Sequence, residues 1–365
     1  MEKKASRFAY IDALNVCATL CVIFLHSNYC VWEGPAGASW PSAIFIETFC
    51  YWAVPIFFMI SGATLIDYRD RMSTKEFFSR RFNKTVIPWL AWSVIGLLFL
   101  LRFAGEFGME RPHLGPRSIF NGIVGTTYVD YYWFFPALFS VYLTIPVLSL
   151  LREGRTFDYL IGLGLAFNSV LPLVCQLVGV VGFGAYQPQM VMGYVLFALI
   201  GYKLSRWNPT KGQRLVIYVL GVAGWLTHLI GTVATSTEAA GVSPTFKGYL
   251  LAPALAHAVA VFVLFKHADF EAADKALPGF VGRLRTASGL TFGVYLTHWF
   301  VLRIARILFE PDVHTLAFRV GGGFVIFCVY GTVTCAQEDT WRETNHPVGI
   351  LVINCWCTRM RSEDI

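Results

Sequence analysis

Apolar runs of about 20 residues recur along nearly the whole chain, and they decide what it can fold into. A helix rises 1.5 Å per residue, so a run of this length spans the roughly 30 Å hydrocarbon core of a bilayer. The chain has 365 residues, of which 56% are hydrophobic and 14% are charged, whereas a typical globular domain has about 25% charged residues. The sequence therefore predicts an all-α integral membrane protein with about ten transmembrane helices. The runs lie near residues 9–31, 43–66, 86–104, 132–151, 158–180, 190–206, 214–236, 248–266, 288–309 and 314–335.

The placement of Lys and Arg predicts the orientation of these helices. With ten spans and a cytoplasmic N-terminus, 22 of the 29 Lys and Arg fall on inner segments. This asymmetry is what the positive-inside rule requires, and it places both termini in the cytoplasm. The net charge of +6 is thus a consequence of topology and does not indicate a nucleic-acid partner.

The chain is predicted to form one polytopic membrane domain over residues 1–365, with a helical core at about 8–335 and a cytoplasmic tail at 336–365. The longest connections, near 105–131 and 267–287, are too short to hold a second core. The nine cysteines are scattered. The pair Cys355 and Cys357 has no second Cys or His pair nearby at zinc spacing, so no metal site is predicted.

Ionisable side chains inside membrane helices are costly and mark candidate functional sites. His26 ends the apolar stretch "CVIFLHSN" near the outer end of the first helix, and Glu47 lies at a similar depth near the start of the second. A carboxylate beside the imidazole would fix its tautomer and make it a better base. The alternative is that each side chain reaches water or bonds a neighbouring backbone group.

The ninth run contains a second histidine and two arginines. His298, in "GVYLTHWF", lies near the middle of this helix, and Arg303 and Arg306 follow at i, i+3 spacing in its outer half. Two arginines within a membrane helix are hard to explain by packing. They predict a polar cavity that opens outward and receives an anionic group, and Arg319 is a candidate to join them.

The stretch "YVDYYWFFP", residues 128–136, gathers aromatic side chains at the outer end of the fourth helix. One interpretation is an aromatic belt at the membrane interface. The other is a surface on which a sugar acceptor stacks, with Tyr132 and Trp133 as candidate contacts.

A basic cluster precedes the third helix on the inner side, in "SRRFNKTVIP". Arg81 and Lys84 are spaced i, i+3, which places them on one face of a helix, and Arg80 adjoins them. Such a face can anchor a phosphate-rich ligand. Ordinary positive-inside charge explains the same residues, and Asp12, at the inner end of the first helix, can form a structural ion pair with them.

Taken in order, six stretches between about residues 8 and 335 resemble acyltransferase family 3, membrane proteins that O-acylate surface and secreted glycans. They are "YIDALNVCATLCVIFLHS", "YWAVPIFFMISGATLI", "FFSRRFNKTVIPWLAWS", "YYWFFPALFSVYLTIPVL", "VMGYVLFALIGYKLS" and "LTFGVYLTHWFVL". The resemblance implies ten helices, acyl-CoA as a donor substrate from the cytoplasm with no permanently bound cofactor, and a bacterial inner membrane. The acceptor it implies is a hydroxyl of a cell-surface or lipid-linked glycan.

The resemblance also assigns individual residues. The helix-1 histidine of the family falls on His26, where it is thought to be catalytic, and the arginine pair before the third helix falls on Arg81 and Lys84. Lys84 keeps the charge but lacks the planar guanidinium. The arginine that usually follows the helix-1 aspartate by three residues is replaced by Asn15.

These observations predict an O-acyltransferase in which His26 takes the proton of the acceptor hydroxyl, with Glu47 as orienter and His298 as oxyanion stabiliser. Direct transfer and a transient acyl-histidine are both compatible with the sequence. The main rival is a transporter or flippase for a polyprenyl-linked or anionic solute, although the internal repeats usual in transporters are not found. A non-catalytic partner in glycan assembly is the third reading, and it predicts that His26, Glu47 and Arg81 tolerate substitution.

Overall fold

The computed structural model describes residues 8–325 and 327, apart from 153, 181–187, 189, 190 and 192. Within this part of the chain the fold is all-α and has no strand, as the sequence predicts. The α-helices are α2 (Ala9–Ser27), α3 (Trp40–Cys50), α4 (Ala53–Leu65), α5 (Thr74–Arg81), α6 (Ile87–Phe103), α7 (Pro116–Val124), α8 (Phe134–Leu151), α9 (Arg155–Gly164), α10 (Leu171–Leu177), α11 (Val195–Arg206), α12 (Lys211–Thr235), α13 (Ala252–Lys266), α14 (Phe270–Ala276) and α15 (Phe280–Phe309).

Short 3₁₀ and π segments extend or join several of these helices. The 3₁₀ segments are η1 (Tyr29–Glu33), η2 (Ile66–Asp70), η4 (Ala104–Phe107) and η5 (Asp130–Trp133). The π segments are η3 (Phe82–Val86), η6 (Leu165–Val170) and η9 (Ala317–Gly322). Because η3 links α5 to α6, and η6 links α9 to α10, each pair forms one longer helical path.

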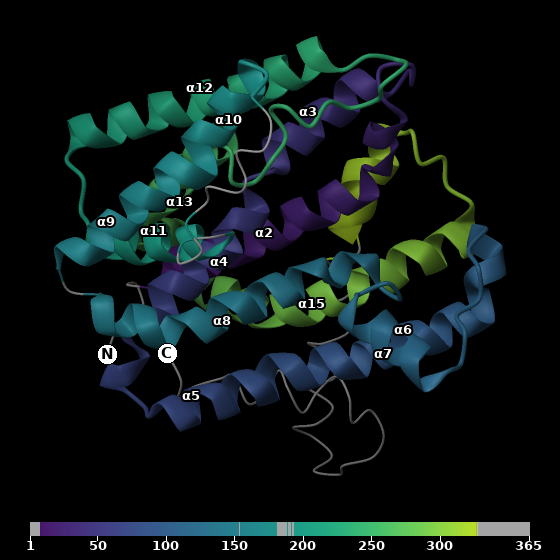
Figure 1. The fold of residues 1–365 in the computed structure, drawn as a ribbon, viewed down its shortest axis with the longest axis horizontal. Coiled ribbons are helices and arrows are strands. Elements are labelled where there is room, and N and C mark those ends of the chain that lie inside the picture. Colours follow the sequence, from purple (N-terminus) through teal and green to yellow (C-terminus); the bar gives the residue numbers. More distant parts are fainter. Residues whose placement is uncertain are drawn as a thin grey trace.

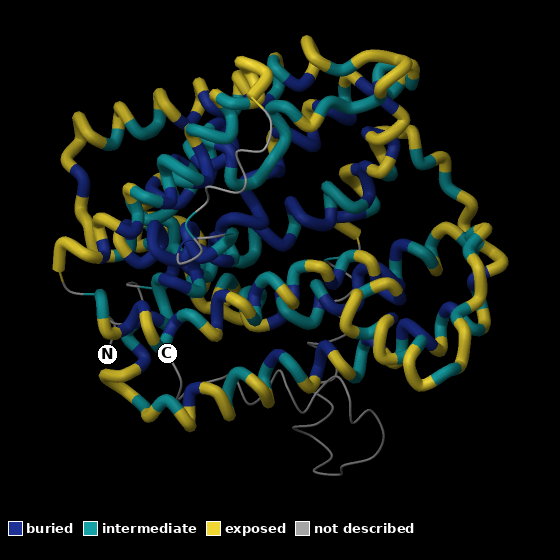
Figure 2. The backbone as a smooth tube through the Cα atoms, in the orientation of Figure 1, coloured by how far each residue is buried: buried dark blue, intermediate teal, exposed yellow. Residues whose placement is uncertain are grey.

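The helices lie roughly along the long axis of the molecule, with α12 at one edge and α5 and α6 at the opposite edge (Figure 1). Buried residues concentrate on α2, α4 and α11, whereas α12 is mostly exposed (Figure 2). The exposed side chains of α12 are nevertheless apolar, including Leu215, Val219, Leu220, Leu226 and Ile230. An apolar surface of this extent fits hydrocarbon rather than water as the surrounding solvent.

The described residues contain seven helical segments that are long and apolar enough to cross a membrane, or eight if the bent pair α13–α14 is one span. The expected count of about ten is therefore not reached. One reason is α11, which replaces the run expected at 190–206 and has only 12 residues, or about 18 Å of helix. The run expected at 314–335, the N-terminus and the tail at 336–365 with Cys355 and Cys357 lie wholly or partly outside the described residues.

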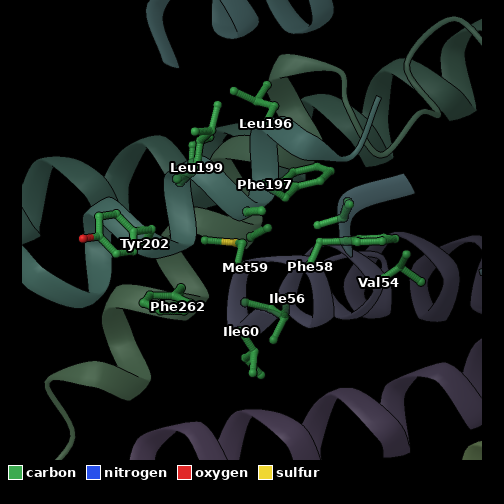
Figure 3. Close-up of a cluster of buried hydrophobic side chains, with 14 of the residues drawn as sticks. Val54, Ile56, Phe58, Met59, Ile60, Leu196, Phe197, Leu199, Tyr202 and Phe262 are labelled. Atoms are coloured by element: carbon green, nitrogen blue, oxygen red, sulfur yellow. The ribbon is translucent and has the colours of Figure 1, made fainter. Parts of the chain in front are cut away.

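The α4–α11 crossing forms the centre of the core. Gly62 and Gly201 let the two backbones approach so closely that a Cβ at either position would overlap backbone atoms of Ala198 or Met59. Small residues at helix contacts are typical of membrane proteins, where close packing replaces the hydrophobic drive between helices. Figure 3 shows the apolar side chains gathered around this crossing.

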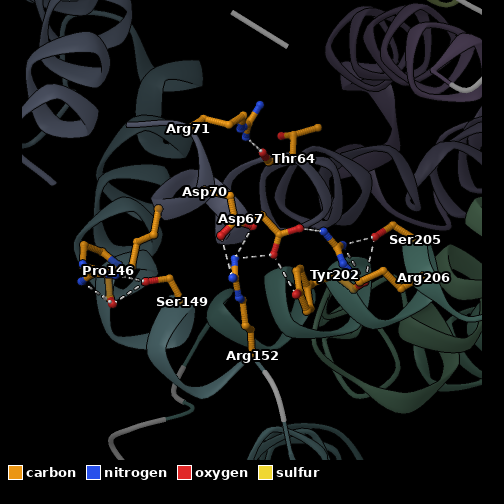
Figure 4. Close-up of polar contacts among 11 residues, drawn as sticks. Thr64, Asp67, Asp70, Arg71, Pro146, Ser149, Arg152, Tyr202, Ser205 and Arg206 are labelled. Atoms are coloured by element: carbon orange, nitrogen blue, oxygen red, sulfur yellow. Dashed lines mark hydrogen bonds and ion pairs between the residues drawn. The ribbon is translucent and has the colours of Figure 1, made fainter. Parts of the chain in front are cut away.

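A cluster of ion pairs ties η2 to the ends of α8 and α11 (Figure 4). Arg152 bonds both carboxylate oxygens of Asp70 at 2.8 and 2.7 Å and reaches Asp67 at 3.2 Å. Asp67 also pairs with Arg206 and accepts a hydrogen bond from Tyr202 at 2.8 Å. These contacts neutralise cations at the end of the bundle where the positive-inside rule expects them.

The helices α2 and α15 pack side by side and run in the same direction. His26 contacts His298, and Asn15 donates a hydrogen bond to Ser288. The two contacts are 11 residues apart on α2 and 10 on α15, so the helices are parallel and in register. Their contact extends over about 16 Å of helix axis.

Candidate active site

His26 and His298 are joined directly by a hydrogen bond. His26 Nδ1 lies 2.7 Å from His298 Nε2, near the C-terminal end of α2 and in the second half of α15. The two imidazole rings are almost parallel, with centroids 4.9 Å apart. His298 is fully buried, whereas His26 is partly exposed. The pair is an imidazole dyad in which one member is accessible.

The hydrogen-bond partners fix which ring nitrogens of the neutral dyad carry protons. His298 Nδ1 lies 2.6 Å from the backbone oxygen of Tyr295. A carbonyl oxygen only accepts, so His298 Nδ1 carries the proton and its Nε2 presents a lone pair. His26 Nδ1–H then donates to that lone pair, which leaves His26 Nε2 as the basic nitrogen. No hydrogen bond to this nitrogen is found among the described residues.

Tyr131 covers one face of the dyad. Its ring stacks on His26 with centroids 3.6 Å apart, and its hydroxyl donates to the backbone oxygen of His26 at 3.4 Å. Tyr295 holds Tyr131 in turn, because its hydroxyl donates to the Tyr131 backbone oxygen at 2.6 Å. Packing and hydrogen bonds therefore restrict the orientation of the His26 ring.

Ser27 and Asn28, the polar residues that follow His26 at the end of α2, form hydrogen bonds to neighbouring segments. Ser27 Oγ donates to the backbone oxygen of Arg319 at 2.7 Å, and Asn28 Nδ2 donates to Ala43 O at 2.7 Å. The Arg319 guanidinium is buried and donates to Asn28 Oδ1 at 3.4 Å and to Ser42 Oγ at 2.9 Å. Arg319 thus anchors the end of α2 and does not join Arg303 and Arg306.

Glu47 is not the partner of His26. It forms a buried ion pair with Lys247, both side chains being 7% exposed. The Lys247 ammonium also lies 4.6 Å from the ring centres of Trp32 and Tyr51. The predicted His26–Glu47 pair is therefore replaced by two separate pairs, His26 with His298 and Glu47 with Lys247. Because both ring nitrogens of His298 are engaged, it orients His26 and has no N–H left for an oxyanion.

The two arginines of α15 lie beyond the dyad toward the C-terminal end of that helix. The Arg303 guanidinium lies 4.3 Å from the ring centre of Trp299 and 4.9 Å from that of Phe107. Trp299 in turn donates to Asp130 Oδ1 at 2.7 Å. Arg306 is exposed. Arg303 is therefore held against an aromatic wall, and Arg306 is the more accessible charge.

Of the two aromatic candidates in "YVDYYWFFP", only Trp133 is accessible. Tyr132 is fully buried and its hydroxyl donates to Leu296 O at 2.6 Å, so it serves the core and cannot form a stacking surface. Trp133 is 36% exposed and stacks near Tyr249, with centroids 5.9 Å apart. Their neighbour Tyr131, which the aromatic stretch alone does not single out, contacts both histidines of the dyad.

Asp12 and Asn15 meet α15 at the opposite end of the α2–α15 contact. Asn15 Nδ2 donates a hydrogen bond to Ser288 Oγ at 3.3 Å, and Asp12 lies near Ser288 and near the positive charge of Arg285. The ion pair expected between Asp12 and the cluster before α6 is thus replaced by contacts to α15. Asn15 and Asp12 form a polar patch with one exposed guanidinium, Arg285, beside it.

The basic cluster Arg80, Arg81 and Lys84 lies where α5 passes into η3. Arg80 pairs with Glu76 at 2.8 Å. The Arg81 guanidinium lies 5.9 Å from the Tyr142 ring centre, and its Nε has no hydrogen bond within the described part of the chain. Lys84 is half-buried near both arginines. Because Lys84 lies in a π turn, its spacing from Arg81 differs from the α-helical spacing that predicted a shared face.

The comparison with family models decides the class of protein. Residues 8–335 match the model described as an acyltransferase domain, that of acyltransferase family 3. The chain belongs to acyltransferase family 3. Comparison with curated proteins returns no match, and comparison with solved structures also returns none.

Family membership and the apolar helices together make this chain a membrane acyltransferase. The match covers both histidines of the dyad and the polar patch at Asp12. Asn15 lies in this patch, and Arg285 of α15 brings a guanidinium to it. Among the described residues, no group of three His, Cys, Asp or Glu side chains is arranged to hold a metal ion.

Proposed function

We propose that this acyltransferase moves an acetyl or similar short acyl group from cytoplasmic acyl-CoA to a hydroxyl of a cell-surface or lipid-linked glycan. The observation that carries the proposal is the His26–His298 hydrogen bond. It leaves a partly exposed imidazole with a free basic nitrogen inside a membrane helix bundle, an arrangement suited to proton transfer.

In the proposed reaction, His26 Nε2 takes the proton of the acceptor hydroxyl as its oxygen attacks the thioester carbonyl. The tetrahedral intermediate then collapses, the C–S bond breaks, and the proton passes from His26 to the departing CoA sulfur. His298 accepts from His26 Nδ1–H throughout and disperses the positive charge that develops on His26. A transient acyl-histidine on His26 Nε2 uses the same nitrogen and stays open as an alternative.

The polar patch and the basic cluster support a donor that enters from the other end of α2. Asp12 and Arg285 lie about 20 Å of helix from the dyad, so a long extended donor can have its charged part at this end and its thioester at His26. Arg81 is the best candidate for a phosphate contact, because its guanidinium is not consumed by a carboxylate in the described structure. Lys84 and Arg80 add positive charge beside it.

The surface near Trp133 supports a sugar acceptor. Trp133, two residues along the chain from Tyr131, presents a 36% exposed ring that stacks on Tyr249, while Tyr131 itself stacks on His26. Sugars commonly use their apolar faces against such rings. Arg303 and Arg306, further along α15, supply charge for an anionic acceptor or lipid-phosphate group.

The donor half can be tested without knowing the acceptor. We expect acetyl-CoA to bind the detergent-purified protein saturably in calorimetry, and Arg81→Ala and Lys84→Ala each to weaken binding by about fivefold to tenfold. Lys75→Ala, an exposed cation on the same helix, is the matched control and should bind as the parent does. Absence of binding by folded protein would overturn the donor assignment and favour transport of an anionic solute.

A further inference from the structure

A cavity of about 350 Å³ lies where the start of α12 meets the end of α13. It shares no residue with the His26–His298 site, and its chemistry does not depend on acyl transfer. Its walls are formed by Lys211, Arg214, Leu215, Tyr218, Leu264, His267 and Ala268.

The polar side of this cavity carries positive charge that the rest of the structure does not neutralise. The side chains of Lys211 and Arg214 have no ion pair or hydrogen bond within the described residues, whereas Arg152, Lys203 and Arg206 at this end of the bundle pair with carboxylates. His267 Nε2 is buried and lacks a partner. Lys266 lies close to His267 and bonds the carbonyls of Leu204 and Trp207 at 2.7 and 2.6 Å.

The carboxylate nearest in sequence does not balance these charges. Asp269 caps the start of α14, where its side chain accepts a hydrogen bond from Ala272 N at 2.8 Å. An unbalanced group of cations around a cavity attracts an anion with several acceptor oxygens. Phosphate has this chemistry.

The other side of the cavity is apolar and open to the membrane. Leu215 is 63% exposed and Leu264 is 54% exposed, and the exposed apolar face of α12 continues from Leu215 through Val219 to Leu226. The site therefore has cations at one end and a hydrocarbon-facing surface directly beside them. By the positive-inside rule this end of the bundle faces the cytoplasm.

We propose that this cavity binds the phosphate head group of an anionic phospholipid from the cytoplasmic leaflet, whose acyl chains lie along α12. The two cations and the imidazole contact the phosphate, while Leu215 and Leu264 contact the start of the chains. A phosphate supplied by a soluble molecule offers the same head-group chemistry, but it would leave the adjoining apolar surface unused.

The test uses the full-length protein in a neutral detergent, with phosphatidylglycerol, phosphatidylcholine and inorganic phosphate as separate probes. Binding is measured by native mass spectrometry and by the shift of the unfolding temperature. We expect phosphatidylglycerol to bind more tightly than phosphatidylcholine. Lys211→Gln and Arg214→Gln should each weaken phosphatidylglycerol binding by about fivefold, and the double variant by on the order of 20-fold.

Lys275→Gln, an exposed cation on the neighbouring α14, is the matched control and should leave binding unchanged. Equal binding of both lipids, or equal binding by the parent and the double variant, would overturn the proposal. Inorganic phosphate that binds at the same concentration as phosphatidylglycerol would also overturn it, because the source would then be soluble. None of these results depends on acetyl-CoA, so the acyltransferase proposal stands or falls separately.

Discussion

The two ends of the α2–α15 contact use different chemistry on the same pair of helices. At one end, His26 and His298 form a largely enclosed hydrogen bond beneath the ring of Tyr131. At the other, Asp12 and Asn15 meet Ser288 beside the exposed Arg285. The first arrangement is suited to moving a proton and the second to recognising charge. Parallel packing in register fixes the separation between them without any flexible connection.

The largest effect is expected from removing the accessible imidazole. His26→Ala should lower acyl transfer about 1000-fold, or about 4 kcal/mol of transition-state stabilisation, because general-base catalysis is lost. The measurement is free-CoA release in the presence of an acceptor. His257→Ala, which removes another partly buried imidazole, should stay within about twofold of the parent.

The Glu47–Lys247 pair should affect stability rather than chemistry. Glu47→Gln leaves Lys247 buried without its counter-ion, and breaking such a pair costs about 3 kcal/mol or more of folding free energy. Thermal unfolding in detergent measures the loss, and the double variant Glu47→Gln/Lys247→Met should recover part of it. Transfer per folded molecule should change by less than about threefold. A loss comparable to that of His26→Ala would place Glu47 in the dyad after all.

Removing the acceptor for His26 Nδ1–H should lower kcat without weakening donor binding. His298→Leu is expected to reduce kcat about 100-fold, or about 2.7 kcal/mol, with KM for acetyl-CoA within about twofold. His298→Gln keeps an oxygen that can accept the same hydrogen bond and should regain part of the activity. A structural role alone would lower the amount of folded enzyme and give no such recovery.

At the opposite end of the contact the kinetic pattern should be reversed. Ser288→Ala removes the hydroxyl that accepts from Asn15 and lies near Asp12, a change worth about 1 kcal/mol for a hydrogen bond. We expect KM for acetyl-CoA to rise about fivefold while kcat stays within about twofold. Thr286→Ala, on the same helix and exposed, is the control. A fall in kcat with unchanged KM would show that this patch does not recognise the donor.

The sequence was sufficient for the all-α class, the membrane setting and the family, because apolar length and ordered motifs are local properties. It was not sufficient for the partner of His26. Glu47 and His298 were both candidates by depth, and His298 lies 272 positions away in the chain, so only the packing of α15 on α2 selects it. Tyr132 was expected at the acceptor surface, but it is buried in the core, and its neighbour Tyr131 contacts His26. Consecutive residues of a helical segment point in different directions, and the sequence alone does not show which of them faces the dyad.

Other differences arise from tertiary packing and from local helix geometry. The run at 190–206 contains α11, whose 12 described residues are enclosed by α4 and its neighbours, so its apolar composition also follows from core packing. Arg81 and Lys84 keep their sequence spacing, but the π turn at η3 changes their angular relation. Arg319 was grouped with other outer arginines by charge, whereas its hydrogen bonds to Asn28 and Ser42 make it an anchor for α2.

The most direct test of the account is to measure donor binding and acyl transfer on the same preparations of the parent protein and His26→Ala. Acetyl-CoA affinity comes from calorimetry, and transfer comes from CoA release across a panel of surface-glycan fragments. The account predicts equal affinity in both proteins and about 1000-fold slower transfer in the variant. Transfer by folded His26→Ala at the parent rate would contradict the central role of the imidazole dyad.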